Sequence, residues 1–185
     1  MQYWKPGNML YPVPAVMVSC ADNKGNSNIL TVAWTGTICS DPAMVYISVR
    51  PERHSHHMIC ESREFVINLT TEKLAYAADF AGVRSGKDID KWEKLGLTKG
   101  TSKKVKVPFI KESPVNIECE VKQILKLGSH DMFIAEVVSV DVDEQYIDKK
   151  GSLNLKAAGL MAYSHGRYYQ LGKQIGRFGF SVKKK

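Results

Sequence analysis

The sequence predicts a mainly β protein with short helices, in which about six strands form a closed antiparallel barrel. Short runs rich in β-branched and aromatic residues recur along the chain, and most are joined by turns of Gly, Asn, Asp or Pro. No glycine-rich dinucleotide motif follows a strand. The chain has 185 residues, 44% of them hydrophobic. This size suits a single domain, residues 1–185, with a C-terminal extension from about residue 151.

The strands are predicted where apolar and β-branched residues are concentrated. The first two runs flank a turn cluster at residues 21–26, and the last two flank the turn at residues 128–131, so each pair predicts a hairpin. The predicted strands are residues 13–20, 28–35, 43–49, 64–69, 115–127 and 132–142.

The helical segments are few. A helix is predicted over residues 56–62, with Ser55 as its N-cap. Residues 71–95 have helical character, but Gly82 and the pair Ser85–Gly86 interrupt it, which favours two helices around a loop. The basic segment 97–107 is predicted to be a loop.

The positive charge is local. The net charge is +7, but the tail of lysines at 183–185 and four lysines between 99 and 106 account for all of it. Charges in tails and loops are usually solvated, and no stripe of alternating aromatic and basic residues is visible. We therefore expect no nucleic-acid partner.

The cysteines and the absence of long apolar runs bear on where in the cell the protein is expected to lie. The four cysteines are not spaced as metal ligands, which predicts buried thiols in a reducing environment and no metal site. No run approaches the roughly 20 apolar residues that span a bilayer, and the N-terminus does not resemble a secretory signal. These features predict a cytoplasmic protein with no membrane partner.

A phosphate site is one interpretation of the segment after the third predicted strand. Arg50 and Arg53 lie in a turn that enters a helix at Ser55. Guanidinium groups, a hydroxyl and the free N–H groups of a helix N-terminus suit an anion. Lys91, which follows the Ser85–Gly86 loop, could add a charge. Exposed arginines and an exposed lysine on a surface helix explain the pattern equally well.

The histidines allow two interpretations. His54, His56 and His57 lack the companions of a usual metal ligand set. His130 lies in the turn of the last hairpin, where it could orient a nicotinamide or the edge of a flavin at the mouth of the barrel. The alternative is that His130 only completes the turn.

Taken in order, these segments resemble the flavin reductase-like family of FMN-binding split barrels, which includes the flavoredoxins. The individual motifs are short, but their order and spacing are specific and cover most of the chain. The matching stretches are residues 28–34, 41–50, 53–55, 64–69, 85–86, 90–92, 128–130, 133–137 and 169–172.

The resemblance implies a six-stranded antiparallel split β-barrel that forms a homodimer with FMN near the subunit interface. It implies that Lys91 neutralises the FMN phosphate and that His130 lies on the nicotinamide side, where His130 and Ser48 are the candidates for catalysis. The implied cofactor-binding residues are Thr31, Val32, Ala33, Trp34, Ser48, Val49, Arg50, Ser55, Ser85 and Lys91.

The leading hypothesis is an oxidoreductase that moves electrons from NADH or NADPH through bound FMN to free flavin, a metal ion or a partner protein. The protein then supplies position and electrostatics, and the cofactor supplies the redox chemistry. Two alternatives stay open. One is a flavoredoxin-type electron carrier that does not react with NAD(P)H, and the other is a flavin- or haem-binding module without turnover.

Overall fold

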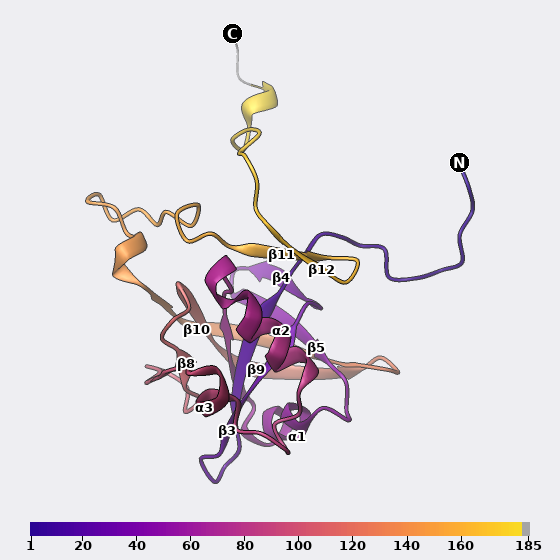
Figure 1. Ribbon diagram of the computed structural model, residues 1–185, viewed down its shortest axis with the longest axis vertical. Coiled ribbons are helices and arrows are strands. Elements are labelled where there is room, and N and C mark those ends of the chain that lie inside the picture. Colours follow the sequence, from indigo (N-terminus) through magenta and orange to yellow (C-terminus); the bar gives the residue numbers. More distant parts are fainter. Residues whose placement is uncertain (183–185) are drawn as a thin grey trace.

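The centre of the molecule is one antiparallel sheet of seven strands that curls into a split barrel (Figure 1). The computed structural model describes residues 1–182. The strand order is β3-β2-β6-β9-β10-β5-β4. The strands are β2 (Val16–Ala21), β3 (Ser27–Val32), β4 (Thr35–Ser40), β5 (Ala43–Val49), β6 (Glu64–Asn68), β9 (Val115–Lys126) and β10 (Asp131–Val142).

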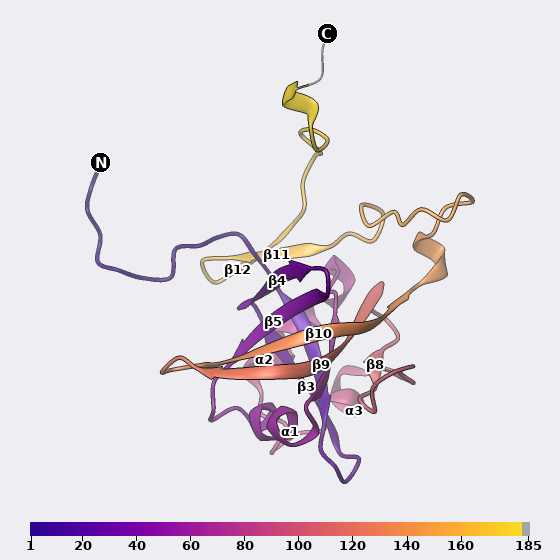
Figure 2. The same cartoon turned by 180° about the vertical axis from the view of Figure 1, so that it is seen from behind.

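Short helices and two small sheets surround this barrel, and both ends of the chain leave it on the same side (Figures 1 and 2). One small sheet joins β1 (Val13–Pro14), β11 (Met161–Ser164) and β12 (Arg167–Gln170), and the other joins β7 (Lys99–Gly100) and β8 (Phe109–Ile110). The helices are α1 (His54–Ser62), α2 (Ala75–Val83) and α3 (Lys91–Leu95), with short 3₁₀ turns at Glu72–Leu74, Glu144–Tyr146 and Phe180–Val182.

The predicted mainly β fold is confirmed, but the prediction of one strand over residues 28–35 is wrong. β3 ends at Val32, and the chain bends at residues 33–34 before β4 begins. Thr35 Oγ1 donates to Tyr46 O at 2.6 Å, and β4 pairs with β5. Residues 36–40, which lie outside the predicted strands, form most of this additional strand.

Ser55 is not the N-cap of α1, which corrects a second prediction. The helix begins at His54, and the residue before it, Arg53, has extended backbone angles and no side-chain capping bond. Ser55 lies inside the first turn, where it is 1% exposed. Its hydroxyl accepts a hydrogen bond from Asn28 Nδ2 at 2.8 Å. The serine therefore ties α1 to β3 instead of capping the helix.

β3 is covered on both faces, which makes it a firm support. Leu30 and Val32 belong to the core inside the barrel, together with Phe65 and Phe133. Ile29 belongs to a second apolar layer outside the barrel, under the helices that follow residue 71. α2 and α3 both pack against this strand. Burial of apolar surface on both faces contributes roughly 25 cal/mol per Å² and fixes the position of the strand.

The predicted helical interval 71–95 forms two helices around a loop, as Ser85–Gly86 indicates. The predicted interruption at Gly82 is wrong, because Gly82 lies within α2. The C-terminal hairpin of β11 and β12 has no counterpart among the predicted elements. Within residues 1–182, no helix combines the length and the apolar character needed to cross a membrane.

A buried carboxylate holds the basic loop that precedes β8. Glu118 on β9 is 1% exposed, and its oxygens accept backbone N–H bonds from Lys103 (2.9 Å), Lys104 (2.6 Å) and Val105 (3.1 Å). Hydrogen bonds to a charged acceptor are stronger than neutral ones, and buried N–H groups without acceptors are costly. The loop is thus fixed through its main chain.

We expect Glu118→Ala to lower the free energy of unfolding by about 2–4 kcal/mol, because it removes the acceptor of three N–H groups. Urea unfolding followed by circular dichroism measures the change. Glu120→Ala is the matched control, since Glu120 is an exposed residue of the same strand whose ion pair with Lys122 contributes little. Equal stability of the two variants would contradict the role assigned to Glu118.

Candidate functional site

Three adjoining cavities form one trough along β3. The inner cavity, of about 190 Å³, is lined by Trp34, Ser48 and His130 among others. The central cavity, of about 490 Å³, shares Leu30, Thr31, Arg50 and Arg53 with it. The outer cavity, of about 530 Å³, shares Asn28, His54, Gly86 and Lys91 with the central one. The trough follows residues 28–34, and since an extended chain rises about 3.3 Å per residue, it is roughly 20 Å long.

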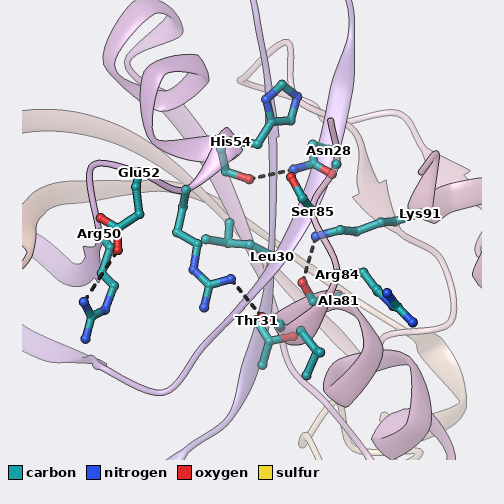
Figure 3. Close-up of a pocket in the computed structure, with 15 residues that line it drawn as sticks. Asn28, Leu30, Thr31, Arg50, Glu52, His54, Ala81, Arg84, Ser85 and Lys91 are labelled. Carbon is teal, nitrogen blue, oxygen red and sulfur yellow. Dashed lines mark hydrogen bonds and ion pairs between the residues drawn. The ribbon is translucent and has the colours of Figure 1, made fainter. Parts of the chain in front are cut away.

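The central cavity is rich in positive charge. Arg50, Arg53, Arg84 and Lys91 line it, against the single carboxylate of Glu52. Figure 3 shows Arg50 beside Glu52 on one side of this cavity, with Lys91 and Arg84 on the opposite side. The pair of Arg50 and Glu52 is 3.5 Å long and largely exposed, so it neutralises little of the charge. The cavity therefore favours an anion.

Lys91 is the buried cation of the site. It is 3% exposed, and its Nζ donates to Ile29 O at 2.6 Å. The same Nζ donates to Ala81 O at 2.7 Å (Figure 3). Burial lowers the pKa of Lys91 from 10.5 to about 8. Within residues 1–182, no carboxylate lies within ion-pair distance of this ammonium. Its third N–H donor is available to an anion in the central cavity.

A glycine brings the loop before α3 close to β3. A Cβ built on Gly86 would lie 2.3 Å from Asn28 Oδ1, so only glycine fits while Asn28 keeps this position. Asn28 in turn donates to Ser55 on α1. Arg53, which precedes α1, donates from Nη1 to Gly82 O near the end of α2 at 3.0 Å. These two bonds join β3, α1 and α2 around the central cavity.

The inner cavity combines an apolar strand with a histidine. Its lining includes Val32, Ala33 and Trp34 at the bend after β3, and Val49 on β5. His130 enters from the turn between β9 and β10, and its Nδ1 lies 2.9 Å from Ser129 Oγ. Partial burial, helped by Arg50, lowers the pKa of His130 below its ordinary 6.5, so the ring is mostly neutral at pH 7.

The structure brings the predicted site residues together in one trough, although they come from five separate segments. His130 and Ser48, the two candidates for catalysis, line the inner cavity. The residues predicted to bind the cofactor line the inner or the central cavity; they are Thr31, Val32, Ala33, Trp34, Ser48, Val49, Arg50, Ser55, Ser85 and Lys91.

The hydroxyl of Thr31 already has a partner in the protein. It donates to Ala78 O on α2, while Thr31 lines both the central and the inner cavity. No group of three or more metal-ligating side chains is found among residues 1–182.

Some lining residues were not assigned from the sequence. Asn28, Gly82 and Arg84 line the central cavity and Tyr163 lines the inner one. Arg53 was noted as one of two arginines in the turn but was not assigned to the site. The glycines at 82 and 86 were the available signal for a close approach. No local signal marks Tyr163, because it reaches the site through the pairing of β11 with β1.

Comparison with known proteins gives a consistent result. The flavin reductase like domain family matches residues 9–172. An uncharacterised protein of Archaeoglobus fulgidus is 34% identical over 147 residues, which cover 80% of this chain and 82% of that protein.

Two solved structures extend the comparison to three dimensions. The flavoredoxin of Desulfovibrio vulgaris (Miyazaki F) is similar over 100% of both chains, with 28% identity and a TM-score of 0.90. A flavin reductase with a split barrel domain from Shewanella frigidimarina is 25% identical, with a TM-score of 0.81 over 90% of this chain and 85% of that one.

We expect Gly86→Ala to destabilise the protein by about 1–3 kcal/mol, because the new methyl group must displace Asn28 from Ser55. Thermal unfolding measures the loss. Gly172→Ala is the control, since a Cβ at Gly172 meets no atom within 4 Å. The close approach of the loop to β3 is wrong if the two variants unfold at the same temperature.

Proposed function

The chain belongs to the flavin reductase like domain family, and on this basis we propose that it is an FMN-dependent oxidoreductase. The observation that carries the proposal is the continuity, along a single strand, of a cationic cavity with one whose wall includes Val32, Ala33 and Trp34. FMN has the matching shape: a charged phosphate, a polar ribityl chain and a flat ring system. Similar solved proteins include an FMN-binding protein of Thermus thermophilus.

The central cavity suits the phosphate. Lys91 offers one N–H that neither Ile29 nor Ala81 uses, and Arg53 has further donors beyond its bond to Gly82. Ser85 lines the cavity at the start of the loop, opposite the first turn of α1. Because Lys91 has no carboxylate partner among the described residues, a phosphate would remove the cost of a buried unpaired charge.

The inner cavity suits the flavin ring. Val32, Ala33 and Trp34 offer an apolar wall and main-chain groups, as the polar edge of the ring requires. Bound FMN would supply the acceptor and donor of electrons. The neutral imidazole of His130 and the hydroxyl of Ser48 would orient the ring or an approaching nicotinamide, and neither needs to act as an acid or base.

We propose NADH or NADPH as the electron source and free flavin, a metal ion or a partner protein as the acceptor. The position of His130 at the inner cavity supports this choice. A flavoredoxin-type carrier is the second candidate, favoured by the full-length similarity to the flavoredoxin of Desulfovibrio vulgaris.

A homodimer is proposed as the working assembly. Large apolar side chains are exposed in both terminal segments, and water alone would be an unfavourable environment for so many. They include Trp4, Leu10, Leu171, Ile175 and Phe178. A second copy of this chain would cover them, and light scattering on the purified protein measures the mass that decides this point.

The cysteines at 20, 39, 60 and 119 are all free thiols, which supports a cytoplasmic location.

We expect the affinity for FMN to fall as the pH rises through about 8. In the free protein Lys91 loses its proton near this pH, whereas the phosphate binds the protonated form, so binding above pH 8 must include proton uptake. Fluorescence titration with FMN from pH 6.5 to 9.5 measures the effect.

Lys91→Met should weaken FMN binding by about 1–3 kcal/mol at pH 7 and remove most of the dependence around pH 8, and Arg50→Ala should weaken it within the same range. Lys94→Met is the control, since Lys94 is an exposed lysine of the same helix that lines none of the three cavities. FMN affinity that is unchanged in Lys91→Met and Arg50→Ala would remove the phosphate assignment.

Mixing the FMN-loaded protein with NADH or NADPH in a stopped-flow instrument separates the reductase from the carrier. A reductase loses flavin absorbance rapidly, and we expect His130→Ala to slow this loss while FMN affinity stays the same. Inertness toward both nucleotides would exclude the reductase and support the carrier. Equal rates in His130→Ala and the unmodified protein would leave His130 with a role in the turn only.

A further inference from the structure

A largely buried hydrogen bond joins the two parts of the fold that frame the trough. His56 Nε2 and Asp131 Oδ2 lie 2.9 Å apart, with side-chain exposures of 14% and 10%. His56 lies in the first turn of α1, directly after the residues that line the central cavity. Asp131 is the first residue of β10 and directly follows His130. The bond therefore spans from the central cavity to the turn at the inner cavity.

The ring of His56 is held on several sides. Its other nitrogen, Nδ1, lies 3.8 Å from Cys60 Sγ one helical turn later. The ring meets the edge of Phe133, with centroids 5.3 Å apart, and Phe133 is fully buried. This surrounding fixes the direction in which Nε2 points, and thus where Asp131 must lie.

Stability alone does not account for this pair. Buried polar pairs contribute little net free energy, because desolvation offsets most of the attraction, and apolar replacements of similar volume often serve as well. What this hydrogen bond adds is a contact with a defined length and direction. The backbone of Asp131 is already aligned by its pairing with Val49 and Lys126. Its side chain adds a separate constraint, because the bond to His56 fixes the distance between the start of β10 and α1.

The turn before Asp131 is otherwise exposed. Leu127, Gly128 and Ser129 are all exposed, and the side chain of Ser129 bonds only to the neighbouring His130 among the contacts of the described residues. His130 itself lines the inner cavity together with Arg50 and Arg53, charged residues of the segment that enters α1. A tie between α1 and the base of the turn would keep His130 at this wall.

We propose that His56 and Asp131 are a positioning pair, which holds the turn carrying His130 against the first turn of α1 and so sets where His130 lies along the inner cavity. The importance of this position for flavin chemistry rests on the proposed function. The geometric claim does not, and it can be tested on protein free of FMN.

The test is a titration of the histidines by NMR in FMN-free protein, with the His130 signal assigned from a His130→Gln variant. In the unmodified chain, partial burial holds the pKa of His130 below its ordinary value. We expect His56→Ala and Asp131→Ala to raise this pKa toward 6.5, because the released ring moves into water. Loss of the Asp131 charge without movement would shift the pKa downward instead, so the sign separates the two causes.

Three further variants complete the experiment. Asp131→Asn keeps an oxygen acceptor for His56 and should not raise the pKa of His130. The double variant His56→Phe with Asp131→Leu keeps the packing without the bond, and it serves if an alanine variant does not fold. It should release His130 as well. Lys122→Ala, which breaks exposed ion pairs on β9, should leave the pKa of His130 unchanged.

An unshifted or lowered pKa of His130 in every folded variant that lacks the bond overturns the proposal. FMN titrations of the same variants report separately on the proposed function. If the unmodified protein does not bind FMN, the proposed function fails, whereas the titration of His130 still decides whether the pair positions the turn.

Discussion

The ammonium of Lys91 is the interaction on which the arrangement of the trough depends. Lys91 begins α3, and its two bonds reach the main chain of β3 at Ile29 and of α2 at Ala81. One side chain thereby links α3 to the neighbouring α2 and to β3, whose Ile29 lies 62 residues earlier in the chain. Since main-chain carbonyls carry only partial negative charge, the ammonium keeps most of its own charge for the cavity. The same group is a structural link and the buried member of the four cations that line the central cavity.

The trough also depends on a division of tasks along β3. One face of the strand packs in the barrel and the other lies under the helices, and both faces are apolar. The polar groups at the site come from side chains at the two ends of the strand, from α1 and from the segment at residues 82–86. A rigid support with adaptable borders is how binding sites on barrels commonly arise.

The sequence was sufficient to predict the strands whose residues alternate or are uniformly apolar. The segment around Arg50, where it predicted an anion site, lines the central cavity. Prediction from the sequence failed where tertiary contacts decide. β4 contains Gly36 and Ser40, which have little strand preference by themselves, and it is a strand because β5 offers it hydrogen bonds. Ser55 is a residue type that often caps helices, but here its hydroxyl accepts a hydrogen bond from Asn28 in the interior. Tyr163 reaches the site through a pairing that spans 150 residues, from Val13.

The loop held by Glu118 has a consequence for how this protein can diverge. The carboxylate accepts hydrogen bonds from peptide N–H groups, so the exposed side chains of Lys103 and Lys104 are not needed to fix the loop. At these two positions proline is excluded, since it has no N–H, whereas most other residues are compatible with the same backbone. Related chains can therefore reverse the charge of this surface while the barrel beneath it keeps its shape, which separates the evolution of surface recognition from that of the fold.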